Sequence, residues 1–336
     1  MKNRHHYAIF KHITTQYGLR LRRIKSFDSM YKKNVVYRAS TNKGKFLIKA
    51  FSNRISDGRR FSKAKLVSNI KKLKKSHYPY IGRFLTTKSG RYYVNTNKKS
   101  YYMMEWVKGH PMQKDPNHYE KLGKALANLH TSYKDSHDSV SSFTKRQIKC
   151  FEIESRLFQL RLKLIKKMKA TSSRWFKEHG KQCIGLANEA WEIIKKPEVQ
   201  HVLSEEKKHP ALIHGDVTIP NIVVHSSKLF LIDWDSLRKG SAYYEIAKTL
   251  SNTAGYKPEL LEALLQGYEK IKRLSPGERL LISALFRFPR EAWNEARNLA
   301  YGRKTRGFDI LKGSWNDRLD CIKKLDQWAY SSSPSP

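Results

Sequence analysis

The sequence is poor in cysteine, in acidic residues and in long apolar runs, and each shortage excludes a class of protein. Its three cysteines lie far apart and form no CxxC pair: Cys150, Cys183 and Cys321. Their number and spacing argue against a disulfide scaffold and against a zinc site, and they suit a reducing compartment. No stretch approaches the ~20 apolar residues of a membrane span, and the N-terminal residues show no apolar run typical of a signal peptide. We therefore expect synthesis in the cytoplasm and no membrane span.

Acidic residues are few beside basic ones. The chain has 67 Lys and Arg against 29 Asp and Glu, a formal net charge of +38. Such a charge attracts polyanions in general, namely nucleic acid, phosphorylated ligands, acidic proteins or anionic surfaces. A solvated basic surface that keeps the protein soluble explains the charge equally well. No recognised nucleic-acid module accompanies it, so a nucleic-acid-binding role depends on the net charge alone.

The order of the patterns along the chain predicts a small sheet lobe followed by a large helical lobe. A length of 336 residues exceeds the ~100–200 residues of one domain. Strand-like runs surround the turn residues Asn42 and Gly44, and two further strand-like stretches cover 80–90 and 91–107. Helical spacing of apolar residues appears in the following ranges: 1–20, 57–75, 119–133, 151–169, 185–195, 257–272 and 277–300. We predict an α+β protein with a sheet lobe at 1–105, a helical lobe at 106–330 and a disordered tail at 331–336.

The segment "ALIHGDVTIPNIVVHSSKLFLIDWD" at 211–235 places three polar residues among apolar ones: Asp216, Asn221 and Asp233. "NIVV" and "LFLID" are strand-like, and "HSSK" between them is turn-like. In a hairpin centred on residue 227, Asn221 and Asp233 would lie opposite each other, roughly 5 Å apart at Cα. An amide oxygen and a carboxylate suit Mg²⁺, which keeps waters or phosphates as its other ligands. The sequence therefore predicts a magnesium site at the open end of this hairpin.

Two more residues complete a phosphotransferase pattern. Asp216 lies on the loop that leads into the hairpin, where a carboxylate can orient an attacking hydroxyl and accept its proton. Lys49, near the end of an early strand, would supply positive charge for the α- and β-phosphates of a nucleotide.

At these residues the chain resembles the aminoglycoside phosphotransferase and choline kinase superfamily. "HGDVTIPN" and "LIDWD" are similar to its catalytic and metal-binding motifs, and "FLIKAF", "YYMMEWVKG" and "LGKALANLH" extend the resemblance over about 46–245. The resemblance implies a two-lobed protein-kinase-like fold that binds ATP and Mg²⁺. It implies Asp216 as catalytic base, Asn221 and Asp233 as metal ligands and Lys49 as the phosphate-binding lysine.

The resemblance also implies roles for residues near these motifs. Adenine would bind to the backbone between Met104 and Val107, including Glu105, whose side chain we expect to serve as a cap or an ion-pair partner. His214 would brace its loop, and Asp235 is a further candidate for a metal contact.

Within this superfamily, the Lys-rich and Tyr-rich sequence is similar to the CotS-like spore coat proteins of Bacillus-type bacteria. This similarity implies synthesis in the mother cell, deposition in the spore coat and other coat proteins as partners. Three functions stay open: a coat protein with or without ATP–Mg-dependent phosphotransferase activity, a soluble small-molecule kinase, and a polyanion-binding or nucleic-acid-binding protein. The basic stretch 140–200 favours an anionic substrate for a kinase.

Two parts that kinase-like folds usually have are missing from the sequence. The only acid between Lys49 and Met104 is Asp57, so the first-lobe helix offers no glutamate to orient Lys49. The segment "SFDSMYKKNVVYRAS", where a phosphate-covering loop is expected, has no glycine. Both absences are consistent with a weak enzyme or with a pseudoenzyme that keeps the fold as a binding module.

Overall fold

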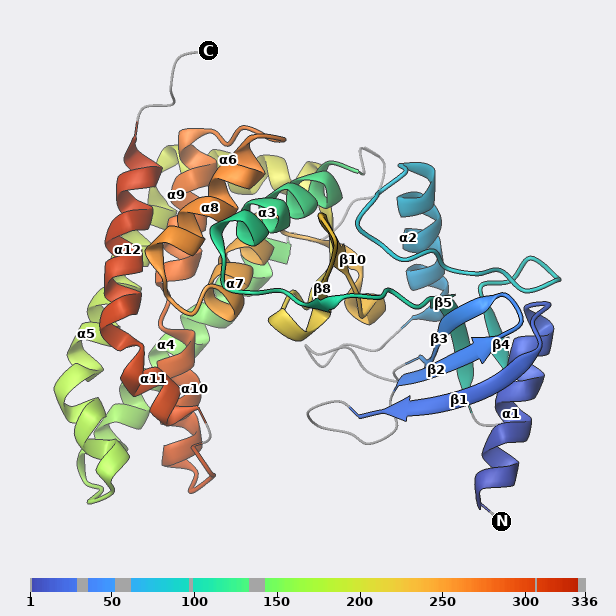
Figure 1. The fold of residues 1–336 in the computed structure, drawn as a ribbon. Coiled ribbons are helices and arrows are strands. Elements are labelled where there is room, and N and C mark those ends of the chain that lie inside the picture. The colour runs from blue at the N-terminus through green and yellow to red at the C-terminus, as the bar shows by residue number, and fades with distance from the viewer. Residues whose placement is uncertain are drawn as a thin grey trace. The chain divides into compact units, whose positions relative to one another are not determined.

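The computed structural model describes residues 2–28, 36–51, 62–96, 99–132, 143–305 and 307–331 (Figure 1). The chain forms two compact units. The first, called here the sheet unit, contains Met1–Met112 and His214–Arg238; the second, the helical unit, contains Gln113–Ile213 and Lys239–Pro336. The segment with the predicted catalytic residues is thus part of the same compact unit as the N-terminal sheet. The predicted lobe boundary at residue 105 stays a prediction, and most of the predicted tail lies outside the described residues.

A five-stranded antiparallel sheet is the centre of the sheet unit, in the order β1-β2-β3-β5-β4. Its strands are β1 (Leu21–Phe27), β2 (Val36–Thr41), β3 (Gly44–Ala50), β4 (Tyr93–Asn95) and β5 (Ser100–Glu105). The predicted hairpin is present, because Thr41 pairs with Gly44 across a two-residue turn. The strand β1 was not predicted. Its apolar residues recur every third position in "LRRIKSF", and a register shift between Leu21 and Arg23 explains why simple alternation fails.

The expected N-terminal helix is α1 (Lys2–Gln16), which packs against this sheet (Figure 1). Its residues Phe10 and Ile13 share one buried cluster with Ala39, Ile48 and Met103 of the strands. These side chains are almost fully buried, so α1 supplies one side of the hydrophobic core of the sheet unit.

The helix expected at 57–75 is α2 (Lys63–Lys75), and the first part of that range lies outside the described residues. It ends in a Schellman-type cap in which Tyr78 N–H donates to Leu73 O and His77 N–H donates to Lys74 O. The strand predicted at 80–90 is wrong. Only isolated bridges form there, from Ile81 to Leu231 and from Phe84 to Met104, and the backbone then turns at Gly90.

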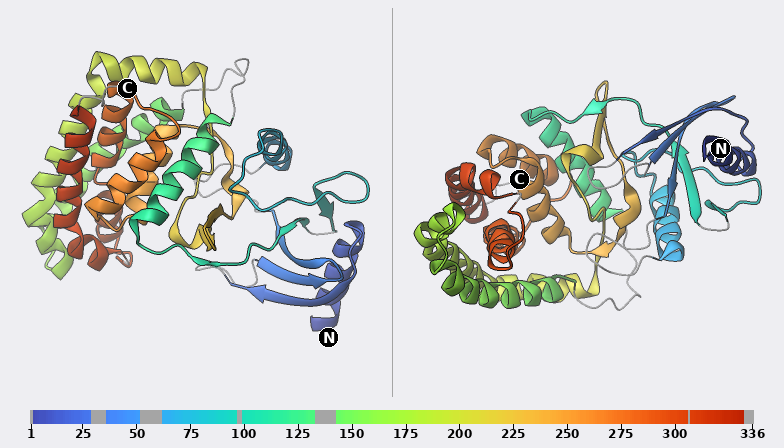
Figure 2. Two further views of the ribbon diagram at one scale, coloured as in Figure 1. Left: turned by 45° about the horizontal axis from the view of Figure 1, so that its top comes forward. Right: turned by 90° about the horizontal axis from the view of Figure 1, so that it is seen from below.

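The helical unit contains the remaining helices of the described chain. They are α3 (Pro116–Thr131), α4 (Phe143–Lys166), α5 (Thr171–Lys195), α6 (Pro197–Lys208), α7 (Ala242–Thr253), α8 (Pro258–Glu269), α9 (Pro276–Arg287), α10 (Arg290–Ala300), α11 (Phe308–Gly313) and α12 (Trp315–Tyr330). The short strands β7 (Ala211–Ile213) and β10 (Arg238–Gly240) pair with each other. The helices α4 and α5 lie side by side (Figure 2). No helix in the described ranges is long and apolar enough to cross a membrane.

The predicted helical segments are helical in the structure, but several of their boundaries differ and some helices were missed. The patterns at 119–133, 151–169, 185–195 and 257–272 lie on α3, α4, α5 and α8, of which α4 and α5 are longer than predicted. The single helix predicted at 277–300 is wrong, because Pro289 separates α9 from α10. Pro197 ends α5 as expected, but it is also the first residue of α6, which was missed together with α7, α11 and α12.

Two glycines explain how closely α3 and α8 pack. A Cβ atom on Gly123 would lie 2.0 Å from Leu264 O, and one on Gly267 would lie 2.1 Å from Glu120 O. Any larger residue at either position would force the two backbones apart. The same helices enclose buried His130, whose ring nitrogens lie 3.0 Å from the Tyr268 hydroxyl and 3.0 Å from Glu245 Oε2.

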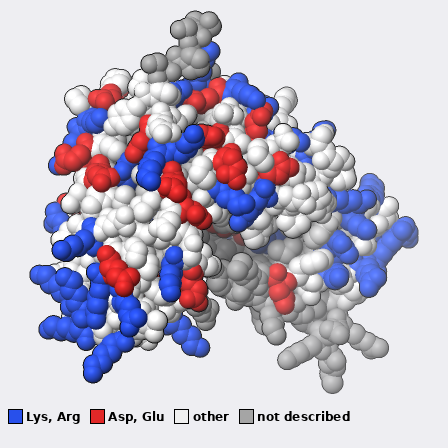
Figure 3. All heavy atoms as spheres, turned by 60° about the vertical axis from the view of Figure 1, so that its left-hand side comes forward, with Lys and Arg blue, Asp and Glu red and all other residues white. Residues whose placement is uncertain are grey.

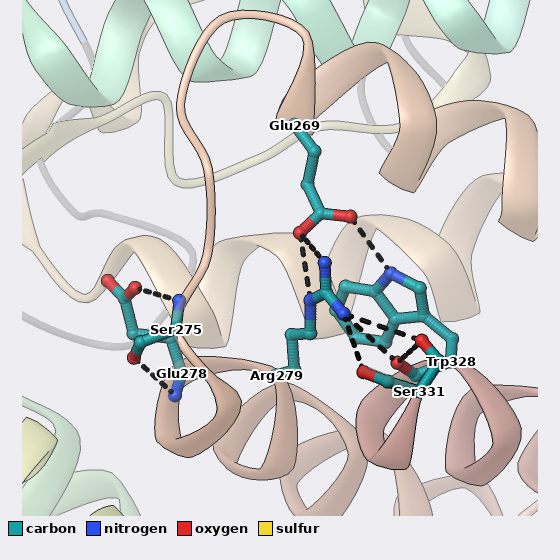
Figure 4. A network of polar contacts seen from close by, with 6 residues as sticks. All are labelled: Glu269, Ser275, Glu278, Arg279, Trp328 and Ser331. Carbon is teal, nitrogen blue, oxygen red and sulfur yellow. Dashed lines mark hydrogen bonds and ion pairs between the residues drawn. The ribbon is translucent and has the colours of Figure 1, made fainter. Parts of the chain in front are cut away.

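A polar network joins the ends of α8, α9 and α12 (Figure 4). Glu269 accepts hydrogen bonds from Arg279 Nε at 2.9 Å and from Trp328 Nε1 at 3.0 Å. The helix α9 starts with a capping box, in which Ser275 and Glu278 satisfy each other's backbone N–H groups. These contacts hold the helix ends together, and Glu269 provides the counter-charge that buried Arg279 needs.

Candidate active site

The hairpin predicted after Asn221 is present in the sheet unit. Its strands are β8 (Ile222–His225) and β9 (Lys228–Leu231), and β6 (His110–Pro111) pairs with β8 on the other side. Before β8, the chain makes a short 3₁₀ turn, η1 (Ile219–Asn221). After β9, a second 3₁₀ turn, η2 (Trp234–Ser236), follows Asp233. The predicted site residues therefore lie at the two ends of one short hairpin.

The register of this hairpin differs by one residue from the prediction. Val223 pairs with Phe230, and the backbone oxygen of Asn221 accepts the N–H of Ile232 at 2.9 Å. Asn221 is thus opposite Ile232, and the predicted pairing with Asp233 is wrong. The cause is the turn, which has two residues instead of three, with Ser226 in the left-handed region at φ 53° as tight hairpins require.

The loop before the hairpin is held by His214, as expected. Its side chain is fully buried, and its Nε2 lies 2.9 Å from Ile232 O while its Nδ1 accepts the N–H of Asp216 at 3.3 Å. With the proton on Nε2, the His214 ring links Ile232, which precedes Asp233, to Asp216, the predicted base. Gly215 between them has φ +84°, and a Cβ there would lie 2.0 Å from Arg238 Nη1 and 2.7 Å from Ser236 O. Only glycine fits this position.

Asp216 and Asn221 lie together. Asn221 Nδ2 donates to the backbone oxygen of Asp216 at 2.9 Å and lies 3.4 Å from Asp216 Oδ2. Since the amide nitrogen is used in this way, the side-chain oxygen of Asn221 is the atom left to act as an acceptor or ligand. Both residues are half-buried.

Lys49 and Asp233 form the second pair. Lys49 Nζ lies 2.5 Å from Asp233 Oδ1 and 2.9 Å from Asp235 Oδ2. The lysine side chain is 7% exposed, Asp235 is 15% exposed and Asp233 is 38% exposed. Asp233 has a left-handed backbone at φ 62°, which aspartate tolerates better than most residues. The pair is therefore buried on the lysine side and open to solvent on the Asp233 side.

Asp235 is the residue that the sequence underestimated. It accepts a hydrogen bond from the Tyr102 hydroxyl at 3.0 Å in addition to its ion pair with Lys49. The side chain expected to be an extra metal contact is thus the buried partner of Lys49. Two features of the sequence could have indicated this pairing: the second acid of the "DWD" motif, and the lack of a glutamate on the first-lobe helix that could pair with Lys49.

The buried charges shift one another's pKa values. Burial acts to lower the pKa of Lys49, but the charges of Asp235 and Asp233 act against it and leave the pKa above its ordinary value. For Asp235, burial is the largest effect and leaves its pKa raised although Lys49 lowers it. Burial also raises the pKa of Tyr102, and the two carboxylates add to the increase, so its hydroxyl keeps its proton.

The helix α2 does not supply a partner for Lys49. Its buried polar residue is Asn69, whose Nδ2 lies 3.4 Å from Leu237 O, just after η2. Asp233 and Asp235 contact Lys49 instead of a helix glutamate. Asp57 and residues 29–35 of the glycine-free stretch 26–40 lie outside the described residues.

The residues predicted to bind adenine lie at the end of β5. Met104 is 2% exposed and pairs with Leu47. Glu105 N–H donates to Arg83 O at 2.9 Å, and its carboxylate forms a solvent-exposed ion pair with the Arg83 side chain. Val107 follows the strand. The adenine role of these residues stays a prediction.

The fold is kinase-like: an antiparallel sheet lobe precedes a larger helical part. The model of the phosphotransferase enzyme family, APH, matches residues 85–281, more than half of the chain. The protein therefore belongs to this family, and the resemblance to the aminoglycoside phosphotransferase and choline kinase superfamily is confirmed at that level.

Solved structures show the same fold at low identity. The chain is similar to an aminoglycoside phosphotransferase from Alicyclobacillus acidocaldarius, with a TM-score of 0.81 and 17% identity over 95% of this chain and 96% of that one. A spectinomycin phosphotransferase in complex with ADP and spectinomycin matches with a TM-score of 0.55 and 13% identity, covering 95% and 92% of the two chains. Choline kinase from Streptococcus pneumoniae matches with a TM-score of 0.51 and 14% identity, covering 96% and 99%. No curated protein sequence matches this chain.

Proposed function

We propose that this protein transfers the γ-phosphoryl group of ATP to a hydroxyl group of a small molecule. The observation that carries the proposal is the double pairing in the sheet unit: Asp233 and Asp235 hold Lys49, and Asn221 holds Asp216. One hairpin connects the two pairs, because the backbone oxygen of Asn221 accepts the N–H of Ile232, the residue before Asp233. Nucleotides are bound by similar proteins, such as the spectinomycin phosphotransferase with ADP and an amicoumacin kinase with AMP-PNP and Ca²⁺.

The donor set fits a hard divalent cation such as Mg²⁺. Asn221 has its amide nitrogen engaged and its oxygen left as a ligand, and Asp233 keeps an exposed carboxylate. No group of three or more His, Cys, Asp and Glu that could hold a metal occurs in the ranges the structure describes, so water and phosphate oxygens would complete the coordination. When bound, Mg²⁺ would neutralise phosphate charge.

Lys49 has the charge and the burial that a phosphate-binding lysine needs. Its raised pKa keeps it protonated at neutral pH. We assign Asp235, supported by Tyr102, the orienting role that a helix glutamate has in other kinase-like folds. Phosphate oxygens would then replace the partly exposed Asp233 at the lysine, while Asp235 stays in place. The backbone from Met104 to Val107 would hold the adenine.

Asp216 would act as the base. Its carboxylate would accept the proton of the acceptor hydroxyl while a bond forms between the acceptor oxygen and the γ-phosphorus. The bond between this phosphorus and the β–γ bridging oxygen breaks, and ADP leaves. The hydrogen bond from Asn221 to the Asp216 backbone fixes the loop that carries this carboxylate. The basic stretch 140–200 supports an anionic acceptor.

Thermal unfolding with ATP and Mg²⁺ tests the binding step. A ligand that binds only the folded state stabilises it by about 2.7 kcal/mol at a hundredfold excess over Kd. We expect a Mg²⁺-dependent rise in Tm for the wild type and none for Asp233→Ala. The exposed Asp309→Ala on α11 is the matched control and should behave as wild type.

Turnover tests the chemical step. With a panel of anionic and neutral hydroxyl compounds, Asp216→Asn should keep the Tm rise and lose about 10²–10⁴-fold in kcat. Full stabilisation by ATP without turnover by the wild type would contradict the catalytic proposal and leave a nucleotide-binding module.

A second proposal concerns location. We propose that the protein is made in the mother cell and deposited in the spore coat, where other coat proteins are its partners. The similarity of its Lys-rich and Tyr-rich sequence, with 18 tyrosines, to CotS-like proteins supports this. A fluorescent fusion should form a ring around the developing spore. A diffuse signal, with intact coats after deletion of the gene, would refute it.

A further inference from the structure

The helix α4 presents an unusual row of apolar side chains to solvent. Ile153, Leu160 and Leu164 are 52%, 56% and 54% exposed. They are three of the five large aliphatic side chains that are exposed in the described part of the chain. Because they are spaced by seven and four residues, they lie along one side of the helix over roughly 16 Å.

This row is additional to the face that α4 uses for packing. Phe158, Leu162 and Ile165 on the other side of the helix are buried in the helical unit. Exposure of three more large aliphatic residues is therefore not needed to hold α4 in place. Single exposed apolar residues are ordinary, but an aligned row of them indicates a surface that binds something.

The surroundings of the row are strongly basic. Residues 152–181, which include the whole row, contain nine Lys and Arg and three acids, Glu152, Glu154 and Glu178. Eight of the nine are exposed: Arg156, Lys163, Lys166, Lys167, Lys169, Arg174, Lys177 and Lys181. Figure 3 shows Lys and Arg side chains gathered at one end of the helical unit, at the lower left, where few acidic side chains lie. We call Ile153, Leu160, Leu164 and these eight residues the α4–α5 basic surface.

We propose that the α4–α5 basic surface binds the surface of an anionic lipid bilayer. The aliphatic side chains enter the boundary between headgroups and acyl chains, and the lysines and arginines contact the anionic headgroups. Apolar residues on one side of a helix beside clustered Lys and Arg are typical of helices that lie on such membranes. Binding of this kind needs no membrane-spanning helix, and none occurs in the described residues.

The aliphatic row favours a bilayer over a soluble polyanion. Nucleic acid would use the lysines, but it offers no apolar phase for Ile153, Leu160 and Leu164, and its single strands are bound through aromatic stacking. An acidic protein is the other candidate. It would need an apolar patch that matches a row of separated side chains, whereas a fluid bilayer accepts such a row without a matching shape.

Sedimentation of the full chain with lipid vesicles tests the proposal. We expect binding to vesicles of phosphatidylcholine with 30% phosphatidylglycerol, no binding to phosphatidylcholine alone, and weaker binding at high salt. The variant Leu160→Ser/Leu164→Ser should bind at least tenfold more weakly. Its control is Ile271→Ser, which removes an exposed aliphatic residue from elsewhere in the helical unit and should bind as wild type.

A charge-reversed pair tests the basic component. Lys163→Glu/Lys167→Glu should also lose at least tenfold in vesicle binding. Lys195→Glu/Lys323→Glu changes the net charge equally at exposed positions outside the surface and should retain most of the binding. Equal losses in both pairs would mean that net charge alone attracts the protein, and would overturn the proposal.

The variant Leu160→Ser/Leu164→Ser distinguishes a bilayer from the other possible ligands, an acidic protein or a nucleic acid. If it binds vesicles as tightly as wild type, no apolar insertion occurs and the proposal is wrong. If it loses binding to an acidic protein but not to vesicles, the surface is a protein-docking site. Duplex DNA serves as the soluble polyanion, and the leucine change should not affect its binding. Thermal unfolding and nucleotide-dependent stabilisation without lipid should match wild type, so the outcome does not depend on the proposed kinase function.

Discussion

Lys49 Nζ lies 2.9 Å from Asp235 Oδ2, and the other oxygen of the same carboxylate accepts the hydroxyl hydrogen of Tyr102. Three buried polar groups thus satisfy one another, and Asp233 adds a fourth contact that remains partly open to solvent. The lysine is held without a helix glutamate. This arrangement makes the energetic role of each group separately measurable.

Replacing Lys49 by methionine should destabilise the protein. The change keeps much of the side-chain volume but leaves Asp235 buried without its counter-charge. Loss of one partner of a buried pair typically costs about 3–5 kcal/mol, and the open Asp233 side reduces this to about 2–4 kcal/mol. Urea unfolding measures the difference. Lys45→Met, an exposed lysine on the same strand, should stay within about 0.5 kcal/mol of wild type.

The contribution of Lys49 should depend on pH only in the alkaline range. Its pKa in the folded protein lies above the ordinary value of 10.5, so folding favours the protonated form. The stabilisation is therefore present in full below about pH 10.5 and is lost as pH rises through the raised pKa. The difference in unfolding free energy between wild type and Lys49→Met should be constant from pH 7 to 9 and shrink above pH 10.5. A difference that grows with pH would contradict the assignment.

The sequence predicted the hairpin and the residues around it better than the contacts between them. Asp216, Asn221 and Asp233 stand out because polar residues interrupt apolar strands, and this pattern is local. The register is also local, but it depends on whether the turn has two or three residues, which "HSSK" alone does not decide. The partner of Lys49 comes from far along the chain, and no local pattern reports such a contact.

The clarity of the local pattern also decides which helices and strands were predicted correctly. Strand and helix patterns with clear periodicity were predicted correctly, as in β2, β3, α2 and α3. The strand β1 was missed because its bulge breaks the alternation. In the region of α9 and α10 the helical period continues through Pro289, so the periodicity suggested one helix although proline separates two.

Gly215 should tolerate no side chain. Gly215→Ala combines a positive φ with a close approach to Arg238 and Ser236, so we expect a loss of more than about 3 kcal/mol and no ATP-dependent stabilisation. Gly90→Ala is the matched control, because Gly90 has φ +77° but no atom within 4 Å of the added Cβ. It should cost only about 1–2 kcal/mol. Equal costs would mean that the close approach at Gly215 is relieved by movement.

His77 occupies a helix-ending position that glycine usually fills. It has φ 53° in the cap of α2, where a side chain is strained by about 1–2 kcal/mol. His77→Gly should therefore stabilise the protein by about 1 kcal/mol in urea unfolding. Ser76→Gly, one residue earlier at φ −80°, relieves no strain and should be neutral or destabilising. Stabilisation by both changes would indicate a general effect of glycine on this loop.

The coupling between Tyr102 and Lys49 should be measurable through Asp235, which both contact. Tyr102→Phe removes the hydroxyl that donates to the carboxylate and should cost about 1.5–3 kcal/mol, the range for a hydrogen bond to a charged group. Once Lys49 is replaced by methionine, Asp235 lacks its cation, and the Tyr102 hydroxyl carries a larger share of the stabilisation of the buried carboxylate. Removing the hydroxyl should therefore cost about 1 kcal/mol more than in wild type. Urea unfolding of the two single variants and the double variant gives this difference. Strict additivity would mean that Tyr102 and Lys49 act on Asp235 independently.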